Sequence, residues 1–137
     1  MNLFVARQPI FDCERRVIAY ELLFRSSTEN RFHGTDTTAA SLQTLDTTLL
    51  GFGLDNLLGD SLWFFNASRT LLVGEHWRVL PPASTVIEVL EVVEPDADIV
   101  QACVNARQAG YRVALDDFVY RPQYEALLAH TDYVKVD

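Results

Sequence analysis

The chain has 137 residues, 49% of them hydrophobic and 22% charged, a composition typical of one globular domain with its own core. The net charge of -8 and the absence of a Lys/Arg cluster argue against nucleic-acid binding. No segment has the roughly 20 apolar residues of a membrane span, and no signal-peptide pattern opens the chain, so we expect a cytoplasmic protein without membrane contact. Cys13 and Cys103 lack metal-knuckle spacing, and we expect both to be reduced.

Apolar runs of strand character recur along the chain. They lie around residues 3–8, 16–25, 61–66, 84–90, 111–116 and 132–137. Helical patterns cover residues 36–50, 96–109 and 122–129. The pattern over 96–109 is the clearest, because Asp96 can cap its start, Cys103 belongs to an apolar stripe and Gly110 ends it.

From residue 61 onward, strands alternate with helices or loops, which predicts βαβ units in a parallel sheet and an α/β domain. An open doubly wound sheet and a (β/α) barrel both fit this order of elements. No glycine-rich phosphate loop follows a strand, which argues against a nucleotide-binding Rossmann or P-loop domain. No linker or repeat divides the chain, so we expect a single domain over residues 1–137.

Polar or ionisable residues lie in or just beyond five of the apolar runs. They are Glu21, Asn66, Glu88, the pair Asp116 and Asp117, and Lys135. Because the carboxyl ends of parallel strands meet at one rim, we expect these side chains to converge there. Carboxylate and amide oxygens suit Mg²⁺, Ca²⁺ or Mn²⁺, and such an ion would offset the repulsion among the carboxylates and attract a phosphodiester. Lys135 could then orient a water molecule or neutralise a phosphate oxygen.

Each of these residues also has a purely structural interpretation. A strand glutamate such as Glu21 or Glu88 can pair with an arginine or lie on an exposed edge. Asn66 can cap a helix, and Asp116 with Asp117 can form a turn. The occurrence of all of them at strand ends is what favours a shared site.

These residues, in this order, resemble the EAL family of cyclic-di-GMP phosphodiesterase domains, over nearly the whole chain. The similar segments are RQPIF (7–11), ELLFR (21–25), FNAS (65–68), IEVLE (87–91), ALDDF (114–118) and VKVD (134–137). The pattern is most similar to the bacterial subgroup in which an EAL-like half precedes an HDOD domain.

The resemblance implies a partial TIM-type (β/α) barrel, about half complete, with an antiparallel first strand. It implies that Mg²⁺ or Mn²⁺ is held by Glu21, Asn66, Glu88 and Asp116, with Asp117 as a further ligand. It implies catalytic roles for Glu21 and for Lys135, which would lie near the attacking water. It also implies that Gln8, Leu23 and Arg25 line the dinucleotide site, where the Arg25 guanidinium suits a phosphate.

The sequence departs from active members of the family in two ways. Those members continue the DDF motif with Gly-Thr-Gly, whereas Val119, Tyr120 and Arg121 follow here and lack glycine's backbone freedom. The chain also ends after the lysine strand, while a TIM-type barrel typically needs about 250 residues. We therefore expect either part of a longer protein, such as one with an HDOD domain, or a half-barrel that forms homo-oligomers.

The function that follows from the resemblance is a degenerate EAL-like signalling domain, catalytically inactive, that acts by binding or scaffolding with cyclic-di-GMP as its ligand. The alternative is a divalent-metal-dependent phosphodiesterase that opens cyclic-di-GMP to pGpG. A third interpretation treats the polar strand residues as relics of the fold.

Overall fold

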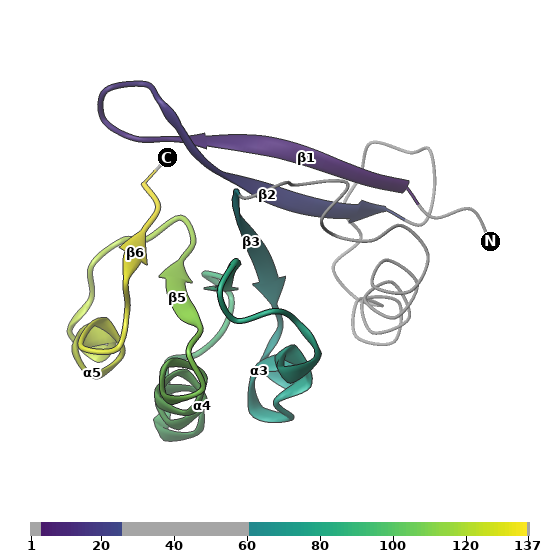
Figure 1. Cartoon of the computed structure of the whole chain (residues 1–137). Coiled ribbons are helices and arrows are strands. Elements are labelled where there is room, and N and C mark those ends of the chain that lie inside the picture. Colours follow the sequence, from purple (N-terminus) through teal and green to yellow (C-terminus); the bar gives the residue numbers. More distant parts are fainter. Residues whose placement is uncertain (1–3, 26–60, 137) are drawn as a thin grey trace. The chain divides into compact units, whose positions relative to one another are not determined.

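The computed structural model describes residues 4–25 and 61–136 (Figure 1). The chain divides into two compact units, and the division falls between Trp63 and Phe64. The helix predicted over residues 36–50 lies outside the described residues.

The first unit contains an antiparallel hairpin formed by β1 (Phe4–Phe11) and β2 (Val17–Arg25). In its register, Gln8 lies opposite Glu21, and a bulge interrupts the pairing between Ile10 and Phe11. The expected antiparallel first strand is therefore confirmed.

The turn of the hairpin is organised by one carboxylate. Oδ1 of Asp12 accepts hydrogen bonds from the backbone N–H groups of Glu14 and Arg16, both at 2.9 Å. Arg15 takes the left-handed conformation that this tight turn requires, with φ of 63°. Such side-chain-to-backbone bonding explains why an aspartate opens the turn.

The sheet continues from β3, most of which lies in the second unit, in the order β3-β4-β5-β6. These strands are β3 (Leu62–Ala67), β4 (Thr85–Val89), β5 (Arg112–Leu115) and β6 (Tyr133–Val134). β4 pairs with β5 and β5 pairs with β6, both in parallel. All five residues of β4 are buried, which explains its continuous apolar sequence around a single glutamate.

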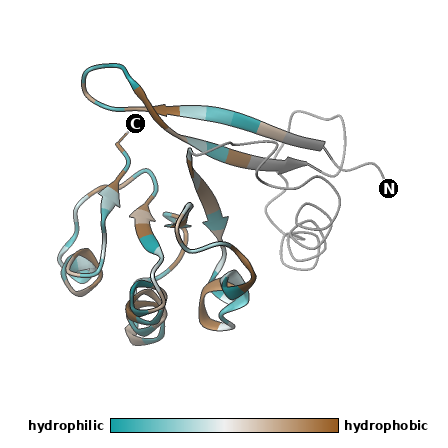
Figure 2. Cartoon of the chain, in the orientation of Figure 1, coloured by the Kyte–Doolittle hydropathy of each residue, from teal (hydrophilic) through white to brown (hydrophobic). Residues whose placement is uncertain are grey.

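Helices connect these strands and lie side by side in Figure 1. They are α3 (Arg69–Val73), the 3₁₀ helix η1 (His76–Val79), α4 (Ala97–Gln108), the 3₁₀ helix η2 (Pro122–Tyr124) and α5 (Glu125–Leu128). Figure 2 shows hydrophobic and hydrophilic residues mixed along α3 and α4, as expected for helices with one face on a core. None of the described helices has the length and apolar character that crossing a membrane requires.

The predicted helix over 96–109 is confirmed as α4. Oδ1 of Asp96 accepts a hydrogen bond from the backbone N–H of Ile99 at 3.1 Å and so caps its start. Cys103 is buried on its inner face. Gly110, with φ of 96°, follows its last turn. The short helix predicted over about 122–129 is confirmed, with a 3₁₀ first turn that begins at Pro122 and leads directly into α5.

The core of the second unit includes Trp77, whose large apolar ring predicts a core position. Trp77 on η1 is 0% exposed, and its Nε1–H donates to the carbonyl of Leu72 at 3.1 Å. The Tyr111 ring contacts it edge-on, with centroids 5.0 Å apart. The Tyr111 hydroxyl in turn donates to the carbonyl of Leu80 at 2.6 Å. These contacts attach the loop before β4 to the start of β5.

Candidate functional site

The site is built from residues at the carboxyl ends of parallel strands. In the sheet register, Glu88 is level with Ala114, and Ala114 is level with Tyr133. Asp116 and Lys135 lie two residues beyond Ala114 and Tyr133. Because side chains alternate along a strand, Glu88, Asp116 and Lys135 all project from one face of the sheet.

Backbone hydrogen bonds continue the sheet beyond the ends of its strands. The N–H of Asp116 donates to the carbonyl of Val89 at 3.0 Å, and the N–H of Lys135 donates to the carbonyl of Leu115 at 2.9 Å. The carbonyl of Lys135 accepts from the N–H of Phe118 at 3.1 Å. The main chain therefore fixes both Asp116 and Lys135, although each lies outside its strand.

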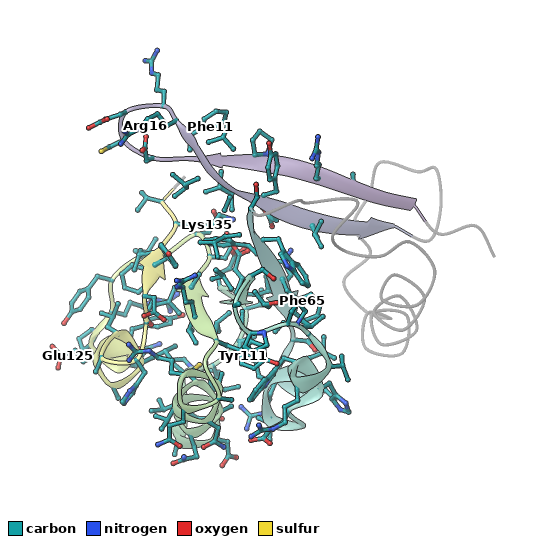
Figure 3. The ribbon with its side chains drawn as sticks, viewed as in Figure 1. Phe11, Arg16, Phe65, Tyr111, Glu125 and Lys135 are labelled. Atoms are coloured by element: carbon teal, nitrogen blue, oxygen red, sulfur yellow. The ribbon has the colours of Figure 1, made fainter. Side chains whose placement is uncertain are left out.

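Lys135 joins two carboxylates. Its Nζ donates to Oε1 of Glu88 at 2.7 Å and to Oδ1 of Asp116 at 3.2 Å (Lys135 is labelled in Figure 3). The Glu88 side chain is 0% exposed, that of Asp116 19% and that of Lys135 23%. A buried carboxylate left without a cation costs about 3–5 kcal/mol, so the ammonium explains how the apolar strand β4 accommodates Glu88.

Asn66 projects from the same face as these residues. The Phe64 ring contacts the Tyr133 ring, with centroids 5.6 Å apart, which places Phe64 on the face where Tyr133 lies. Asn66 is two residues further along β3 and therefore shares this face. The helix that follows is capped by Ser68, whose Oγ accepts from the N–H of Leu71 at 3.4 Å. The capping interpretation of Asn66 is therefore wrong, because Ser68 fills that position.

A second cluster of carboxylates includes Asp117. Carboxylate oxygens of Glu91, Asp116 and Asp117 lie within 4.8 Å of one another. Asp117 has φ of 43°, a left-handed conformation that is strained for most residues but tolerated by Asp. Desolvation of its carboxylate, and then the negative charges of Asp117 and Asp116, raise the pKa of the exposed Glu91 above its ordinary value. A cation bound here would relieve this repulsion.

Next to the acidic group lies a pocket of about 300 Å³. Its lining comes from the ends of β4 and β5 and from the segment that follows β5, and includes Glu91, Asp116, Asp117, Phe118, Arg121 and Tyr124. The Phe118 and Tyr124 rings meet edge-on at 5.5 Å, and the Arg121 guanidinium lies 5.9 Å from the Tyr124 ring centre. Aromatic and charged groups therefore adjoin the carboxylates.

The donor set fits a hard divalent cation. Glu88, Asp116, Asp117 and Asn66 offer carboxylate and amide oxygens, the ligands that Mg²⁺ and Mn²⁺ prefer. Oε2 of Glu88 and Oδ1 of Asn66 are buried oxygens that accept no hydrogen bond within the described ranges, although both residues take part in other interactions. The chemistry of these atoms therefore suits the predicted ion.

The remaining predicted residues lie on the hairpin of the first unit. Gln8 and Glu21 are directly opposite each other in the antiparallel register, so their side chains share one face of the hairpin. Leu23 and Arg25 are paired in the same ladder, and their side chains lie outside those that the structure describes. The assignment of these residues to a ligand site stays a prediction.

Glu91 is the residue of this region that sequence reasoning did not select. It lies beyond the end of β4, in a turn, and is exposed. A signal for it was present, since IEVLE places Glu91 three residues after Glu88. Glu91 was not predicted as a site residue, because only residues at strand ends were considered.

A scan against protein-family models finds no match. Two curated proteins match nearly the whole chain. The cyclic di-GMP phosphodiesterase CdgJ of Vibrio cholerae is 36% identical over 98% of this chain and 31% of its own length. The uncharacterised protein YuxH of Bacillus subtilis is 34% identical over 100% of this chain and 35% of its own. The chain thus spans about a third of the length of these relatives.

Solved structures show the same fold. A calcium and cyclic-di-GMP complex of BlrP1 from Klebsiella pneumoniae has a TM-score of 0.69 and 24% identity, over 98% of this chain and 40% of that one. YkuI of Bacillus subtilis, a protein with an EAL domain solved with cyclic-di-GMP and calcium, has a TM-score of 0.66 and 20% identity, over 98% and 41%. An EAL domain protein from Listeria monocytogenes has a TM-score of 0.60 and 20% identity, over 98% and 63%.

The expected α/β half-barrel is thereby confirmed, because each of these structures matches nearly all of this chain with only part of its own. The sequence matches to CdgJ and YuxH extend over the same residues. The predicted resemblance holds: this chain is similar in sequence to a cyclic di-GMP phosphodiesterase and has the fold of part of the solved EAL structures.

Proposed function

We propose that this chain is the amino-terminal part of a degenerate EAL-like signalling domain that takes a divalent cation and cyclic-di-GMP and acts by binding or scaffolding, without hydrolysis. The observation that carries the proposal is the cluster of Glu88, Asp116 and Lys135 on one face of three parallel strands. Carboxylates gathered in this way attract a cation, and a cation allows an acidic protein to hold a phosphodiester. The likeness to CdgJ and to the solved EAL structures supports cyclic-di-GMP as the ligand.

The cation would be Mg²⁺ or Mn²⁺, held by Asn66, Glu88 and Asp116, with Asp117 and the hairpin residue Glu21 as further ligands. When bound, it would neutralise and polarise phosphate oxygens. BlrP1 and YkuI were solved with calcium, which is consistent with an oxygen-only site for a divalent ion.

The dinucleotide would be positioned by hairpin residues. In the proposal, Gln8, Leu23 and Arg25 line its site, and the Arg25 guanidinium binds a phosphate through two hydrogen bonds. Lys135 would hold a water molecule or a phosphate oxygen. These roles depend on residue type and on the resemblance.

The segment after Asp117 favours binding without turnover. Val119, Tyr120 and Arg121 carry side chains where active members of the family have Gly-Thr-Gly, and Val119 and Tyr120 are 71% and 56% exposed. Side chains restrict the backbone conformations that glycine permits. A loop with this restriction would be slower to assemble a second part of a catalytic site.

The second candidate function is hydrolysis of cyclic-di-GMP to pGpG, with Glu21 and Lys135 as catalytic residues. It is favoured by the name of the Vibrio cholerae relative, a cyclic di-GMP phosphodiesterase, and by the presence of every ligand that the resemblance implies in this part of the domain. In this reading, the metal would activate the attacking water.

Binding and turnover can be separated in one set of measurements. Calorimetric titration with cyclic-di-GMP, with and without Mn²⁺, should show Mn²⁺-dependent binding, and chromatography should show no pGpG. Asp116→Asn should weaken Mn²⁺ binding by at least about tenfold, because even loss of a residue that only orients a ligand typically costs about 10–100-fold. Asp98→Asn, an exposed carboxylate on α4, is the matched control and should change neither property. Formation of pGpG that is lost in Glu21→Ala would establish the second function, and absence of any binding would contradict both.

We further propose that this chain works with additional protein, either a following segment such as an HDOD domain or a second copy of itself. The chain spans 31% and 35% of its two curated relatives, which supports this idea. Size-exclusion chromatography with light scattering tests the second form. A monomer that is stably folded at all concentrations would exclude self-association.

A further inference from the structure

The site contains a cation of its own. Lys135 donates to both Glu88 and Asp116, two of the carboxylates that the proposed function assigns to a divalent ion. Lys135 is also the only lysine among the 137 residues, whereas the other ten basic residues are arginines. An ammonium is a compact charge on a flexible stem, and it releases a carboxylate more readily than the planar, two-pronged guanidinium of arginine.

The burial of Glu88 requires a cation at all times. Its side chain is 0% exposed, so a charged carboxylate here without a counter-charge would destabilise the fold strongly. Lys135 meets this need at 2.7 Å. A divalent cation placed on Glu88 and Asp116 would meet the same need, and its double charge would repel a nearby ammonium.

The lysine side chain can leave while its backbone stays. The main-chain N–H and carbonyl of Lys135 are both hydrogen-bonded, to Leu115 and Phe118. Its side chain, however, is 23% exposed, whereas that of Glu88 is 0% exposed. Movement of the four-carbon stem alone therefore suffices to exchange one cation for another.

We propose that Lys135 is a built-in counter-cation that holds Glu88 and Asp116 in place while the site is empty of metal and withdraws when a divalent cation binds. This inference rests on the proposed function, in that it requires a divalent ion at these carboxylates. In the ion-free state, the ammonium of Lys135 keeps this end of the sheet folded. It also sets the affinity for the ion, because binding must displace a charge that is already in place.

The ammonium can be followed directly in the wild-type chain. With ¹⁵N-labelled lysine, the protein gives a single side-chain ammonium signal, since it has one lysine. In the ion-free protein we expect slow hydrogen exchange at this group. Titration with Mg²⁺, which is diamagnetic, should shift the signal and accelerate its exchange, in step with the binding isotherm from calorimetry. A signal that stays unshifted and protected while Mg²⁺ binds would overturn the exchange.

Lys135→Met removes the charge and keeps the length of the side chain. In EDTA, it should lower Tm by more than about 4 °C, the shift that 1 kcal/mol typically causes in a small domain. It should bind Mn²⁺ at least about tenfold more tightly, because the competing charge is gone. The control is Arg112→Met, which removes an exposed positive charge at the opposite end of β5 and should change neither value.

The outcomes separate this inference from the proposed function. Weaker or equal Mn²⁺ binding in Lys135→Met, with normal binding in the wild type, would overturn the exchange and leave the proposed function intact. No Mg²⁺ or Mn²⁺ binding in the wild type or the variant would contradict the proposed function, and the exchange with it. If Lys135→Met does not fold, the ammonium signal of the wild-type chain alone shows whether Lys135 releases the carboxylates when Mg²⁺ binds.

Discussion

The Nζ atom of Lys135 and Oε1 of Glu88 lie 2.7 Å apart, although 47 positions separate the two residues in the chain. The parallel register of β4, β5 and β6 brings them together, because Glu88, Ala114 and Tyr133 are level across the three strands. The carboxylate of Glu88 on β4 therefore pairs with the ammonium of Lys135, which follows β6, two strands away.

Trp77 is expected to be the anchor of η1. Trp77→Phe keeps an aromatic ring but removes the hydrogen bond from Nε1 to the carbonyl of Leu72, which still accepts from the Glu75 amide at 3.2 Å. Loss of one buried hydrogen bond costs about 0.5–1.5 kcal/mol, and urea denaturation should show a loss of unfolding free energy of about this size. Val79→Ala, at a position 61% exposed on the same helix, should change it by less than about 0.5 kcal/mol. Equal effects of the two substitutions would contradict this assignment.

Asp96 is expected to stabilise α4 in a pH-dependent way. The hydrogen bond from the Ile99 amide, followed by that from Arg69, lowers the pKa of the Asp96 carboxyl below its usual 3.8. A group whose pKa is lower in the folded state contributes stability above its unfolded pKa and loses it as the pH falls through the folded value. Asp96→Ala should therefore be less stable than the wild type at pH 7, and the difference should shrink well below pH 3.8.

Asp98→Ala serves as the control for this cap. It removes the other Arg69 partner, at 3.2 Å, but leaves the hydrogen bond between Asp96 and the Ile99 amide in place. Urea denaturation at both pH values should show a smaller loss than in Asp96→Ala. If the two variants lose equal stability, the ion pair with Arg69 matters more than the cap.

The two thiols should react very differently. Cys13 is exposed in the hairpin turn, whereas burial raises the pKa of Cys103 on α4 to about 12. Ellman's reagent at pH 8 should therefore modify one thiol per native chain rapidly and a second only after denaturation. In Cys13→Ser, the fast reaction should disappear. Rapid modification of two thiols in the native wild type would show that Cys103 is not sealed in the core.

Gly110 should resist replacement because of its backbone. Its φ is 96°, and a Cβ at this position would meet Pro82 Cβ at an ordinary 3.6 Å, so the cost is one of conformation and not of space. Gly110→Ala should reduce the unfolding free energy by about 1–2 kcal/mol, measured by urea denaturation. Gly110→Asn should lose less, since asparagine tolerates left-handed backbone better than alanine does. The reverse order would point to a steric cause.

Long, patterned elements were predictable from the sequence. The apolar runs gave the strands, and α4 carried both a cap at Asp96 and a buried stripe that includes Cys103. The segment of α3 and η1 was predicted only as a short helix or loop, because elements of five and four residues hold too few residues for a helical period. Such short helices depend on local caps such as Ser68 and on tertiary contacts such as those of Trp77.

The site was predictable only in part. Placement at strand ends identified Glu88, Asp116 and Lys135, which the sheet brings into contact. The left-handed backbone of Asp117 and the proximity of Glu91 were not predictable, because both depend on how the chain turns after its strands. Turn geometry follows from tertiary contacts, such as the bond between the Phe118 amide and the Lys135 carbonyl, which a sequence does not display.

The amides of Asp116 and Lys135 are bonded to the neighbouring strands and not to the loops that follow them. The segment from Val119 to Arg121 can therefore diverge in sequence without displacing either residue. Substitutions in the surrounding loops can therefore change what binds at this end of the sheet, while the strands keep the charged side chains in the same positions.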